Sequence, residues 1–297
     1  MIQNLFDKIS PSIHKGINWL INNQNRDGGW GPAPNVRSNI PSTVAAINTL
    51  ILFFDFNDEK IRRGLFWIFE NRNSDGGWGL FRDKASNVFC TSSVLSLMGK
   101  IPFKKWDKNI MDFGITWLKK AQNGDGSWGI YPSMSGSVHE TCHCLKVFVK
   151  IRENRLCENA INWLIKNQNT DGGWGFYKGN PSDPHLTAHV IQILSKYDNK
   201  RYSKFIRDGI RWEVANQEDD GSWRVKNVYQ KTEMVVYSLM MCNLGYNSNV
   251  ILKGIKWLLS NQNENGSWAL SLGDNIGSTM PTAFTIRCLY NFLNKNK

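Results

Sequence analysis

Four of the five histidines form two pairs with four-residue spacing, His139/His143 and His185/His189. Residues four apart on an α-helix lie on one face, so each pair would present two imidazoles to the same side. The first pair encloses Glu140 and reads H-E-x-x-H, a helical pattern that offers two imidazoles to one metal ion with a glutamate beside them. Four imidazoles suit a divalent metal, zinc first, with iron, nickel and copper as alternatives. Such an ion would act as a Lewis acid or activate water.

Both pairs occupy the same place in consecutive copies of an internal repeat. Each of six segments carries two tryptophans eleven residues apart, separated by a turn such as N-Q-N-R-D-G-G-W at 23–30. The tryptophan pairs are Trp19/Trp30, Trp67/Trp78, Trp117/Trp128, Trp163/Trp174, Trp212/Trp223 and Trp257/Trp268. A reference position, the start of an apolar run, follows each turn at Thr43, Thr91, Thr141, Thr187, Met234 and Thr282. The spacing of 46 to 50 residues between reference positions is typical of a solenoid or a closed array of two-helix units.

Each repeat predicts an amphipathic helix, a loop rich in Asp, Asn and Gly, and a second, more apolar helix, as in 16–24 and 43–52. Six such hairpins predict an all-α fold, an (α/α)6 barrel with the apolar helices inside and a central cavity. Because the repeat is continuous, we expect a single domain over 1–297.

The start of each inner helix follows from a polar residue four positions before the reference position. These residues are Asn39, Asn87, Ser137, Asp183, Gln230 and Ser278, and all but the glutamine are good N-cap types. With this cap the histidines take the second and sixth positions of two neighbouring inner helices. Since neighbouring helices pack about 8–10 Å apart, the four imidazoles are expected to meet.

Carboxylates accompany the histidines in this register. Glu140 and Glu233 would share the third helical position, and one of them should orient an imidazole or serve as a base. Two structural alternatives stay open. Ser137 with Glu140 forms a capping-box pattern, and Asp183 is a plausible N-cap before Pro184 as well as a candidate catalytic residue.

The remaining residues at the histidine levels predict a mostly apolar pocket with one polar wall, although plain core packing is the alternative. The expected lining is Phe89, Cys90, Ser93, Thr232, Val236, Met280 and Phe284. Cys90 could be a ligand or a nucleophile, whereas buried free cysteines are usually inert.

Composition narrows the classes of partner and compartment. The net charge is +11, but the Lys and Arg residues are dispersed and no RNA- or DNA-reading motif occurs, so we expect no nucleic-acid partner. Contact with a membrane surface stays open. The chain shows no apolar 18-residue segment and no signal-peptide profile, and its six cysteines read as reduced thiols, which favours a cytoplasmic protein.

The N-Q-x-x-D-G-G/S-W turns resemble the QW repeats of the superfamily that contains squalene/hopene cyclases (class II terpene cyclases) and protein prenyltransferase β-subunits. The resemblance spans the whole chain and implies an α/α barrel whose cavity takes isoprenoid or similarly apolar substrates. Repeat 2 departs from the pattern with Arg72 in place of the glutamine, and repeat 5 has Arg224 after its tryptophan.

The catalytic motifs of these relatives are incomplete. Class II terpene cyclases protonate an alkene with the middle aspartate of D-x-D-D-T-A, and the matching segment here is D-P-H-L-T-A at 183–188. His185 stands where that aspartate would be, and an imidazolium is a far weaker acid than the tuned carboxylic acid this step needs. Prenyltransferases hold zinc with Asp, Cys and His, whereas Glu140 stands where their histidine would be and no D-x-C segment lies near Asn87.

The leading hypothesis is a terpene-cyclase-like enzyme acting on an isoprenoid, terpenoid or polyketide-like substrate with a four-histidine metal site. Its class would be lyase, isomerase or metal-dependent hydrolase, with no obligatory protein partner. One alternative is a cofactor-free cyclase or isomerase in which a histidine–carboxylate pair moves protons. Another is a non-catalytic barrel that binds an isoprenoid or a partner protein.

Overall fold

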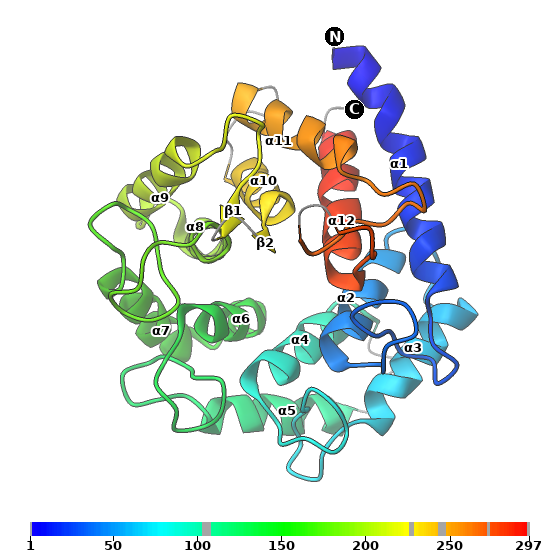
Figure 1. Cartoon of the computed structure of the whole chain (residues 1–297). Helices are drawn as coiled ribbons and strands as arrows, with labels where there is room; N and C mark the ends of the chain where they lie inside the picture. Colours follow the sequence, from blue (N-terminus) through cyan, green and yellow to red (C-terminus); the bar gives the residue numbers. More distant parts are fainter. Residues whose placement is uncertain (1, 103–107, 226–228, 243–247, 272–273, 296–297) are drawn as a thin grey trace.

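A computed structural model describes residues 2–102, 108–225, 229–242, 248–271 and 274–295 (Figure 1). The helices over these residues are α1 Ile2–Asn22, α2 Ile40–Leu50, α3 Glu59–Glu70, α4 Val88–Met98, α5 Lys108–Lys120, α6 Val138–Phe148, α7 Asn154–Lys166, α8 Pro184–Asp198, α9 Ser203–Ala215, α10 Thr232–Met241, α11 Asn249–Ser260 and α12 Thr279–Lys295. Two short strands, β1 Arg224–Val225 and β2 Tyr229–Gln230, pair antiparallel ahead of α10. The prediction of an all-α fold is therefore confirmed, apart from this hairpin.

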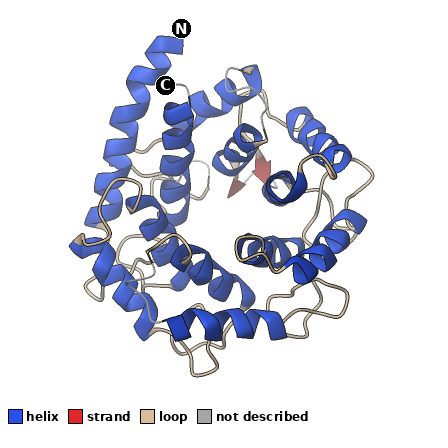
Figure 2. Cartoon of the chain, turned by 180° about the vertical axis from the view of Figure 1, so that it is seen from behind, coloured by secondary structure: helices blue, strands red, loops and turns tan. Residues whose placement is uncertain are grey.

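The helices form two concentric layers (Figures 1 and 2). The even-numbered helices form the inner ring, in which each contacts the next, and α12 contacts α2 to close the ring. Each inner helix also packs against the outer helix that follows it in the chain, and α12 packs against α1. Each inner helix thus packs against the outer helix of the next repeat, and α12 of the sixth repeat packs against α1 of the first.

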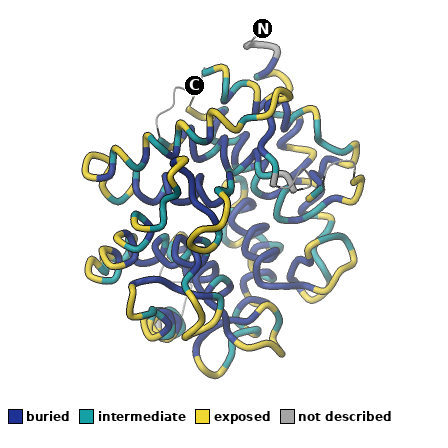
Figure 3. Tube along the Cα trace, turned by 60° about the vertical axis from the view of Figure 1, so that its left-hand side comes forward, coloured by how far each residue is buried: buried dark blue, intermediate teal, exposed yellow. Residues whose placement is uncertain are grey.

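The two layers differ in burial as their sequences predict (Figure 3). Every residue of the inner helix α2 is buried, whereas the outer helix α3 buries one face that includes Ile61, Leu65 and Ile68. Gly64 on that face lies so close to α2 that a Cβ atom would stand 2.8 Å from Ile47 Cδ1. The outer helix therefore buries its apolar face against the inner ring, which accounts for its amphipathic sequence.

The tryptophan turn holds both helices of its own repeat. Trp30 donates from its backbone N–H to Thr43 Oγ1 at 2.9 Å and from Nε1 to the Leu20 carbonyl at 2.8 Å. The same two bonds recur at the other five turns. The reference residue is therefore a buried acceptor for the turn, which explains why it is a threonine.

The glutamine of five turns and the aspartate of four turns reach the next repeat. Gln24 Nε2 donates to the Lys60 carbonyl of α3 at 2.9 Å, and Trp67 Nε1 of α3 donates to Asp27 Oδ2 at 3.0 Å. In the sixth repeat Gln262 Nε2 donates to the Ser12 carbonyl of α1 at 2.9 Å. The motif thus fastens each repeat to its neighbour and closes the ring.

One hydroxyl in the turn is supplied from either of two positions. In repeats 1, 2 and 4 the turn reads G-G-W, and a later serine donates to the turn aspartate, as Ser38 does to Asp27 Oδ1 at 2.8 Å. In repeat 3 the turn reads G-S-W, and Ser127 donates to Asp125 Oδ1 while the later residue is Gly136. A Cβ atom on Gly136 would stand 1.9 Å from Ser127 Oγ, so there is room for one side chain only.

The register predicted for repeat 5 is wrong by two residues. Trp223 N–H donates to Thr232 Oγ1 at 3.0 Å, the bond that every other turn makes to its reference threonine. A Cβ atom on Gly254 of α11 would meet Val236, four residues after Thr232, just as Gly209 of α9 meets Ile191, four after Thr187. The reference residue is therefore Thr232 and not Met234.

The β1–β2 hairpin is the physical reason for this difference. Gln230, the expected N-cap, lies in β2, and the residue in the cap position of α10 is Lys231, which makes no side-chain cap bond. In the other repeats three helical residues precede the reference threonine, whereas α10 begins at Thr232 itself and the residues before it are not helical. The other five N-cap predictions agree with the observed helix starts.

No helix within the described ranges combines the length and the apolar character needed to cross a bilayer. The single-domain assignment and the cytoplasmic location remain predictions.

Candidate active site

The histidines lie where the repeat register predicts. His139 and His143 are the second and sixth residues of α6, and His185 and His189 are the second and sixth of α8. Ser137 Oγ accepts the Glu140 N–H at 3.2 Å, and Asp183 Oδ1 accepts the Leu186 N–H at 3.0 Å, so both helices begin at a side-chain cap. Because α6 and α8 are neighbours in the inner ring, the equal caps bring the two pairs to the same height.

The four imidazole rings form one cluster. Ring centroids lie 4.6 Å apart within the α6 pair and 4.3 Å apart within the α8 pair. Between the helices, His143 lies 5.3 Å from His189, and His139 lies 5.7 Å from His185. His189 is only 2% exposed. The prediction that the two pairs converge therefore agrees with the structure.

Glu140 is the carboxylate of the cluster. It accepts a hydrogen bond from His139 Nδ1 at 3.0 Å and another from the Ser137 hydroxyl. Burial raises the pKa of Glu140, but the bonds and charge of His139 and the Ser137 bond outweigh burial and leave the pKa below its usual value. The expected capping box is only half formed, because the Ser137 amide donates to the Trp128 carbonyl instead of to Glu140. The carboxylate thus fixes His139 with its proton on Nδ1.

Lys146 fixes a second imidazole. Its Nζ lies 3.2 Å from His189 Nε2, and an ammonium has only donors, so Nε2 is the acceptor. The proton of neutral His189 then sits on Nδ1, a buried atom without a hydrogen-bond partner among the described residues. His189 therefore holds an unused donor inside the protein.

Three of the four imidazoles are neutral near pH 7. Burial, reinforced by the charges of Lys146, His139 and His185, holds the pKa of His143 well below its usual range. Burial also lowers the pKa of His185, with Lys231 as the next cause, and that of His189, with Lys146 next. Neutral imidazoles accept protons, so His185 does not replace the alkene-protonating aspartate expected from the resemblance.

The residues do not fit the predicted metal. Zinc needs three or four donor atoms about 2.0–2.1 Å from one point. Across the ranges that the structure describes, no three His, Cys, Asp or Glu side chains converge in this way. Glu140 and Lys146 instead take up nitrogens of His139 and His189.

The corrected register moves Glu233 away from the cluster. Glu233 directly follows the reference residue Thr232, so its counterpart on α6 is Cys142 and not Glu140. It is buried, which raises its pKa to about 7, and its charge acts on Cys288 of α12. The residue in the position of Glu140 is Lys231, whose charge acts on His185 and Asp183. Of the two predicted carboxylates, the one that contacts a histidine is Glu140.

The other predicted residues fall into two groups. Phe89 packs against His139 and His143 with ring centroids 5.0 and 4.8 Å away, and Met280 and Phe284 are half-buried at the equivalent positions of α12. The second group is buried. It comprises Ser93 and Cys90 on α4, and Thr232 and Val236, which lie in the packing between Trp223 and α11. Burial raises the pKa of the Cys90 thiol to about 12, which opposes a role as a nucleophile.

Asp183 serves as the N-cap of α8. Its pKa is raised by burial, against the opposing effect of the Leu186 amide and the charge of Lys231. Thr232 and Val236 were expected to line the pocket because the register of repeat 5 was wrong. With the register corrected, Met234 and Tyr237 are the half-buried residues of α10.

Sequence reasoning missed Lys146, Tyr237, Arg287 and Glu213. The first three stand five residues after the reference threonines of α6, α10 and α12, and aligning the inner helices on those threonines would have found them. Glu213 stands on α9 where the other outer helices carry leucine or isoleucine. That break in the repeat was also visible in the sequence.

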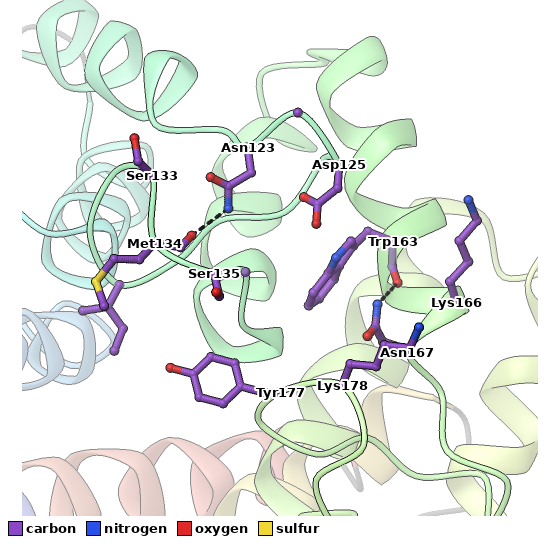
Figure 4. A pocket seen from close by; sticks show the side chains of 13 residues that line it. Asn123, Asp125, Ser133, Met134, Ser135, Trp163, Lys166, Asn167, Tyr177 and Lys178 are labelled. Carbon is purple, nitrogen blue, oxygen red and sulfur yellow. Dashed lines mark hydrogen bonds between the residues drawn. The ribbon is translucent and has the colours of Figure 1, made fainter.

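A surface pocket of about 910 Å³ lies apart from the histidines, between the turns of repeats 3 and 4 (Figure 4). Its lining includes Asn123, Asp125, Trp163, Lys166, Tyr177 and Lys178. Phe176 stands next to this pocket, packing against Tyr177 at 4.8 Å and against His139 at 6.2 Å between ring centroids. None of the predicted site residues lines the pocket.

Comparisons with known proteins agree with this architecture. The family model of the squalene-hopene cyclase C-terminal domain matches residues 81–187 and 179–278, about two thirds of the chain. The type II terpene cyclase MstE from Scytonema has a similar structure, with a TM-score of 0.77 at 16% identity over 97% of this chain and 99% of that chain. A protein from Actinoplanes gives a TM-score of 0.74 at 17% identity over 96% and 99%.

A longer enzyme, ent-copalyl diphosphate synthase from Streptomyces platensis, gives a TM-score of 0.63 at 18% identity over 86% of this chain and 50% of that chain. No curated protein sequence matches the chain. The likeness to these structures concerns the fold, and the family model covers the greater part of the sequence. The chain therefore belongs to the squalene-hopene cyclase C-terminal domain family.

Proposed function

We propose that the protein is a terpene-cyclase-like enzyme that moves a proton on an apolar, isoprenoid-class substrate with its histidine cluster and without a cofactor. The observation that carries this proposal is the contact of four imidazole rings at 4.3 to 6.2 Å, two of them fixed by Glu140 and Lys146. Buried, hydrogen-bonded imidazoles with lowered pKa values are typical of proton-transfer sites.

The apolar substrate is supported by the surroundings of the cluster. Phe89, Met234, Met280 and Phe284 are half-buried on the inward faces of three inner helices, so solvent reaches apolar side chains inside the ring. MstE binds geranylgeranyl dihydroxybenzoate, an isoprenoid substrate, in a barrel of the same fold. The space between the inner helices is the place we assign to the substrate chain.

The protonation states define what the site can do. A neutral imidazole of His143 or His185 accepts a proton from a carbon or hydroxyl of the substrate, and the released electron pair moves to a neighbouring atom. The His189 Nδ1–H and the Lys146 ammonium are the donors that can stabilise a developing negative charge on oxygen. Such base-assisted chemistry is that of an isomerase or a lyase, and differs from cyclisation initiated by a strong acid.

Product analysis in heavy water tests this proposal. Purified protein is incubated in D2O with isoprenoid alcohols, aldehydes and phenols, and products and deuterium content are read by mass spectrometry. His143→Asn should lower the rate at least about a hundredfold, the effect of losing a general base, and His189→Asn should lower it to a similar extent by removing the Nδ1–H donor. His14→Asn is the matched control, since His14 is exposed on the outer helix α1.

Two results would contradict the proposal. Full activity in both site variants would move the chemistry elsewhere, and a substrate that binds but is returned unchanged would make the protein a binding barrel. Elemental analysis accompanies the assay, because a stoichiometric metal that is lost in the His143 and His189 variants would favour metal-assisted chemistry over the cofactor-free site.

A further inference from the structure

A complete ring of polar side chains follows the histidine level, toward the C-terminal ends of the inner helices. Each inner helix carries a hydrogen-bonding residue five positions after its reference threonine. These residues are Asn48, Ser96, Lys146, Gln192, Tyr237 and Arg287. Asn48 is buried and the other five are half-buried, although their neighbours on either side in the helices are buried. Polar groups turned inward at one height favour a polar ligand, because an apolar chain would leave their remaining hydrogen-bonding capacity unused.

Three lysines extend this ring by one turn. Lys100, Lys150 and Lys196 stand nine residues after the reference threonines of three consecutive repeats. All three, together with Lys146 and Arg287, are close enough for their charges to act on one another. Arg287 comes from α12, on the far side of the ring from α6 (Figure 1), and its charge still acts on Lys146, as expected if both side chains extend toward the axis.

Three of the five cations donate to neutral groups. Lys100 Nζ donates to Asn48 Oδ1 at 2.6 Å, Lys150 Nζ donates to the Gly99 carbonyl, and Lys146 donates to His189. Among the ion pairs of the described residues, none involves any of the five. A lysine has three donors and an arginine five, so most of their donors are left for a ligand.

Lys100, which is exposed just beyond the end of α4, is affected by the other four cations. Its pKa is lowered to about 7, first by loss of hydration and then by the positive charges of the other cations, Arg287, Lys146, Lys150 and Lys196. The charges that act on it most strongly are all positive. An anion between these cations would remove their mutual repulsion.

We propose that the C-terminal ends of α4, α6 and α8, together with Arg287 of α12, form a binding site for a phosphate-type oxyanion. This oxyanion is the phosphorylated head group of the apolar substrate. This assignment rests on the proposed function, because it makes head group and apolar chain parts of one molecule. Phosphate or diphosphate fits better than a carboxylate, since one negative charge would leave most of the five cations unpaired and would offer them only two acceptor oxygens.

The spacing along α6 relates the head group to the histidines. Lys146 follows His139 by seven residues, which at 1.5 Å per residue is about 10 Å along the axis. Lys146 contacts both sites, since it belongs to the cationic cluster and donates to His189. A head group held at the cluster therefore places the first part of its chain beside the imidazoles and the apolar side chains Phe89, Met280 and Phe284.

Calorimetric titration of the whole protein tests the site. The probes are inorganic pyrophosphate, a prenyl diphosphate and the matching prenyl alcohol. Wild-type protein should bind pyrophosphate saturably and the prenyl diphosphate more tightly than either fragment. Lys100→Met and Arg287→Leu should each weaken binding of both anions about tenfold or more, the loss expected for one charge-assisted contact. Lys256→Met, the same charge change on the outer face of α11, should leave both affinities within about twofold.

A failure of the anion site can be told apart from a failure of the proposed histidine chemistry, because the titration measures binding without turnover. Absence of saturable pyrophosphate binding, or binding that the Lys100 and Arg287 variants leave intact, would overturn the site even if uncharged isoprenoids react. Equal affinity for pyrophosphate and prenyl diphosphate would overturn the assignment of the anion as a head group. Tight prenyl diphosphate binding that survives inactive histidine variants would support the site independently of the chemistry.

The pH dependence gives a second readout. The groups that face Lys100 are Lys146, Lys150, Lys196 and Arg287, with Asn48 as its hydrogen-bond partner. Because the pKa of Lys100 is about 7, pyrophosphate affinity should fall as the pH rises through neutrality, and the Lys100→Met variant should lose this part of the fall. An unchanged pH profile in that variant would contradict a contact between Lys100 and the anion.

Discussion

Replacing Glu213 by leucine should stabilise the fold. Glu213 is 0% exposed, and neither carboxyl oxygen has a hydrogen-bond partner among the described residues. Its backbone carbonyl accepts Trp223 Nε1 at 2.8 Å. The residues that make this bond in the other repeats are Leu20, Ile68, Leu118, Leu164 and Leu258. Leucine is therefore the side chain for which this position is built.

The size of the effect follows from the state of the carboxyl. Burial raises the pKa of Glu213 well above 4.5. Repulsion from Asp183 adds to this shift, and the Ala188 amide opposes it. A buried polar group without a partner costs about 1–3 kcal/mol. In addition, each pH unit over which Glu213 is protonated in the folded state and ionised in the unfolded state lowers stability by about 1.4 kcal/mol.

The sign of the pH dependence is fixed by the direction of this shift. Because the folded pKa is raised, the contribution of Glu213 to stability is greatest below 4.5 and is lost as the pH rises toward the folded pKa. The leucine variant has no such loss. Its advantage over the wild type should thus be about 1–3 kcal/mol at low pH and larger near neutral pH.

Urea unfolding followed by circular dichroism measures the stability advantage of the leucine variant at about pH 5 and at about pH 7. The control is Glu264→Leu, because Glu264 is exposed in the turn of repeat 6 and its replacement should change stability by less than about 0.5 kcal/mol. A leucine variant that is less stable than the wild type, or whose advantage is the same at both pH values, would refute the reasoning. It would mean that Glu213 is ionised and paired in the folded protein.

Three further predictions concern packing and reactivity. Gly136→Ala should destabilise the protein by about 1–3 kcal/mol, since its Cβ would overlap Ser127 Oγ, and the double change Ser127→Gly with Gly136→Ser should restore stability in the same urea assay. Thr187→Val should cost about 1–3 kcal/mol by leaving the buried Trp174 N–H without its acceptor, and a neutral effect would show that the bond is dispensable. Cys90 should resist iodoacetamide at pH 8 in the folded protein and react once urea unfolds it, because burial raises its pKa to about 12; rapid labelling of the folded protein, read by peptide mass spectrometry, would contradict this.

The position of the histidines could be predicted because it depends on local signals. Ser137 and Asp183 cap their helices with their own side chains, and a cap fixes the residues that follow it whatever the rest of the chain does. The equal register of His143 and His189 then follows from the repeat. The same reasoning failed at Gln230, where no such cap exists and a β-hairpin replaces the first helical turn.

The contacts that define the chemistry could not be predicted in this way. The bond of Lys146 to His189 joins two helices, and the effect of Arg287 on Lys146 acts across the ring. Whether Glu140 would cap its helix or hold an imidazole depended on competition for the Ser137 amide, which the Trp128 carbonyl wins. The metal prediction rested on residue types, their spacing and the repeat register, and did not include the partners that occupy nitrogens of His139 and His189.

The two-residue error in repeat 5 had a larger consequence than the misplacement of Glu233. With Met234 as the reference, the residue five positions later is Leu239, which is fully buried, and the inner helices show no continuous polar ring. With Thr232 as the reference, that residue is Tyr237, and all six helices carry a hydrogen-bonding group at the same height. The bond from Trp223 to Thr232 therefore does more than place one helix. In the register that it fixes, the imidazoles and half-buried apolar groups of the inner helices stand at one level and the polar and cationic groups at another, which is the arrangement that the proposed ligand with a charged head group and an apolar chain requires.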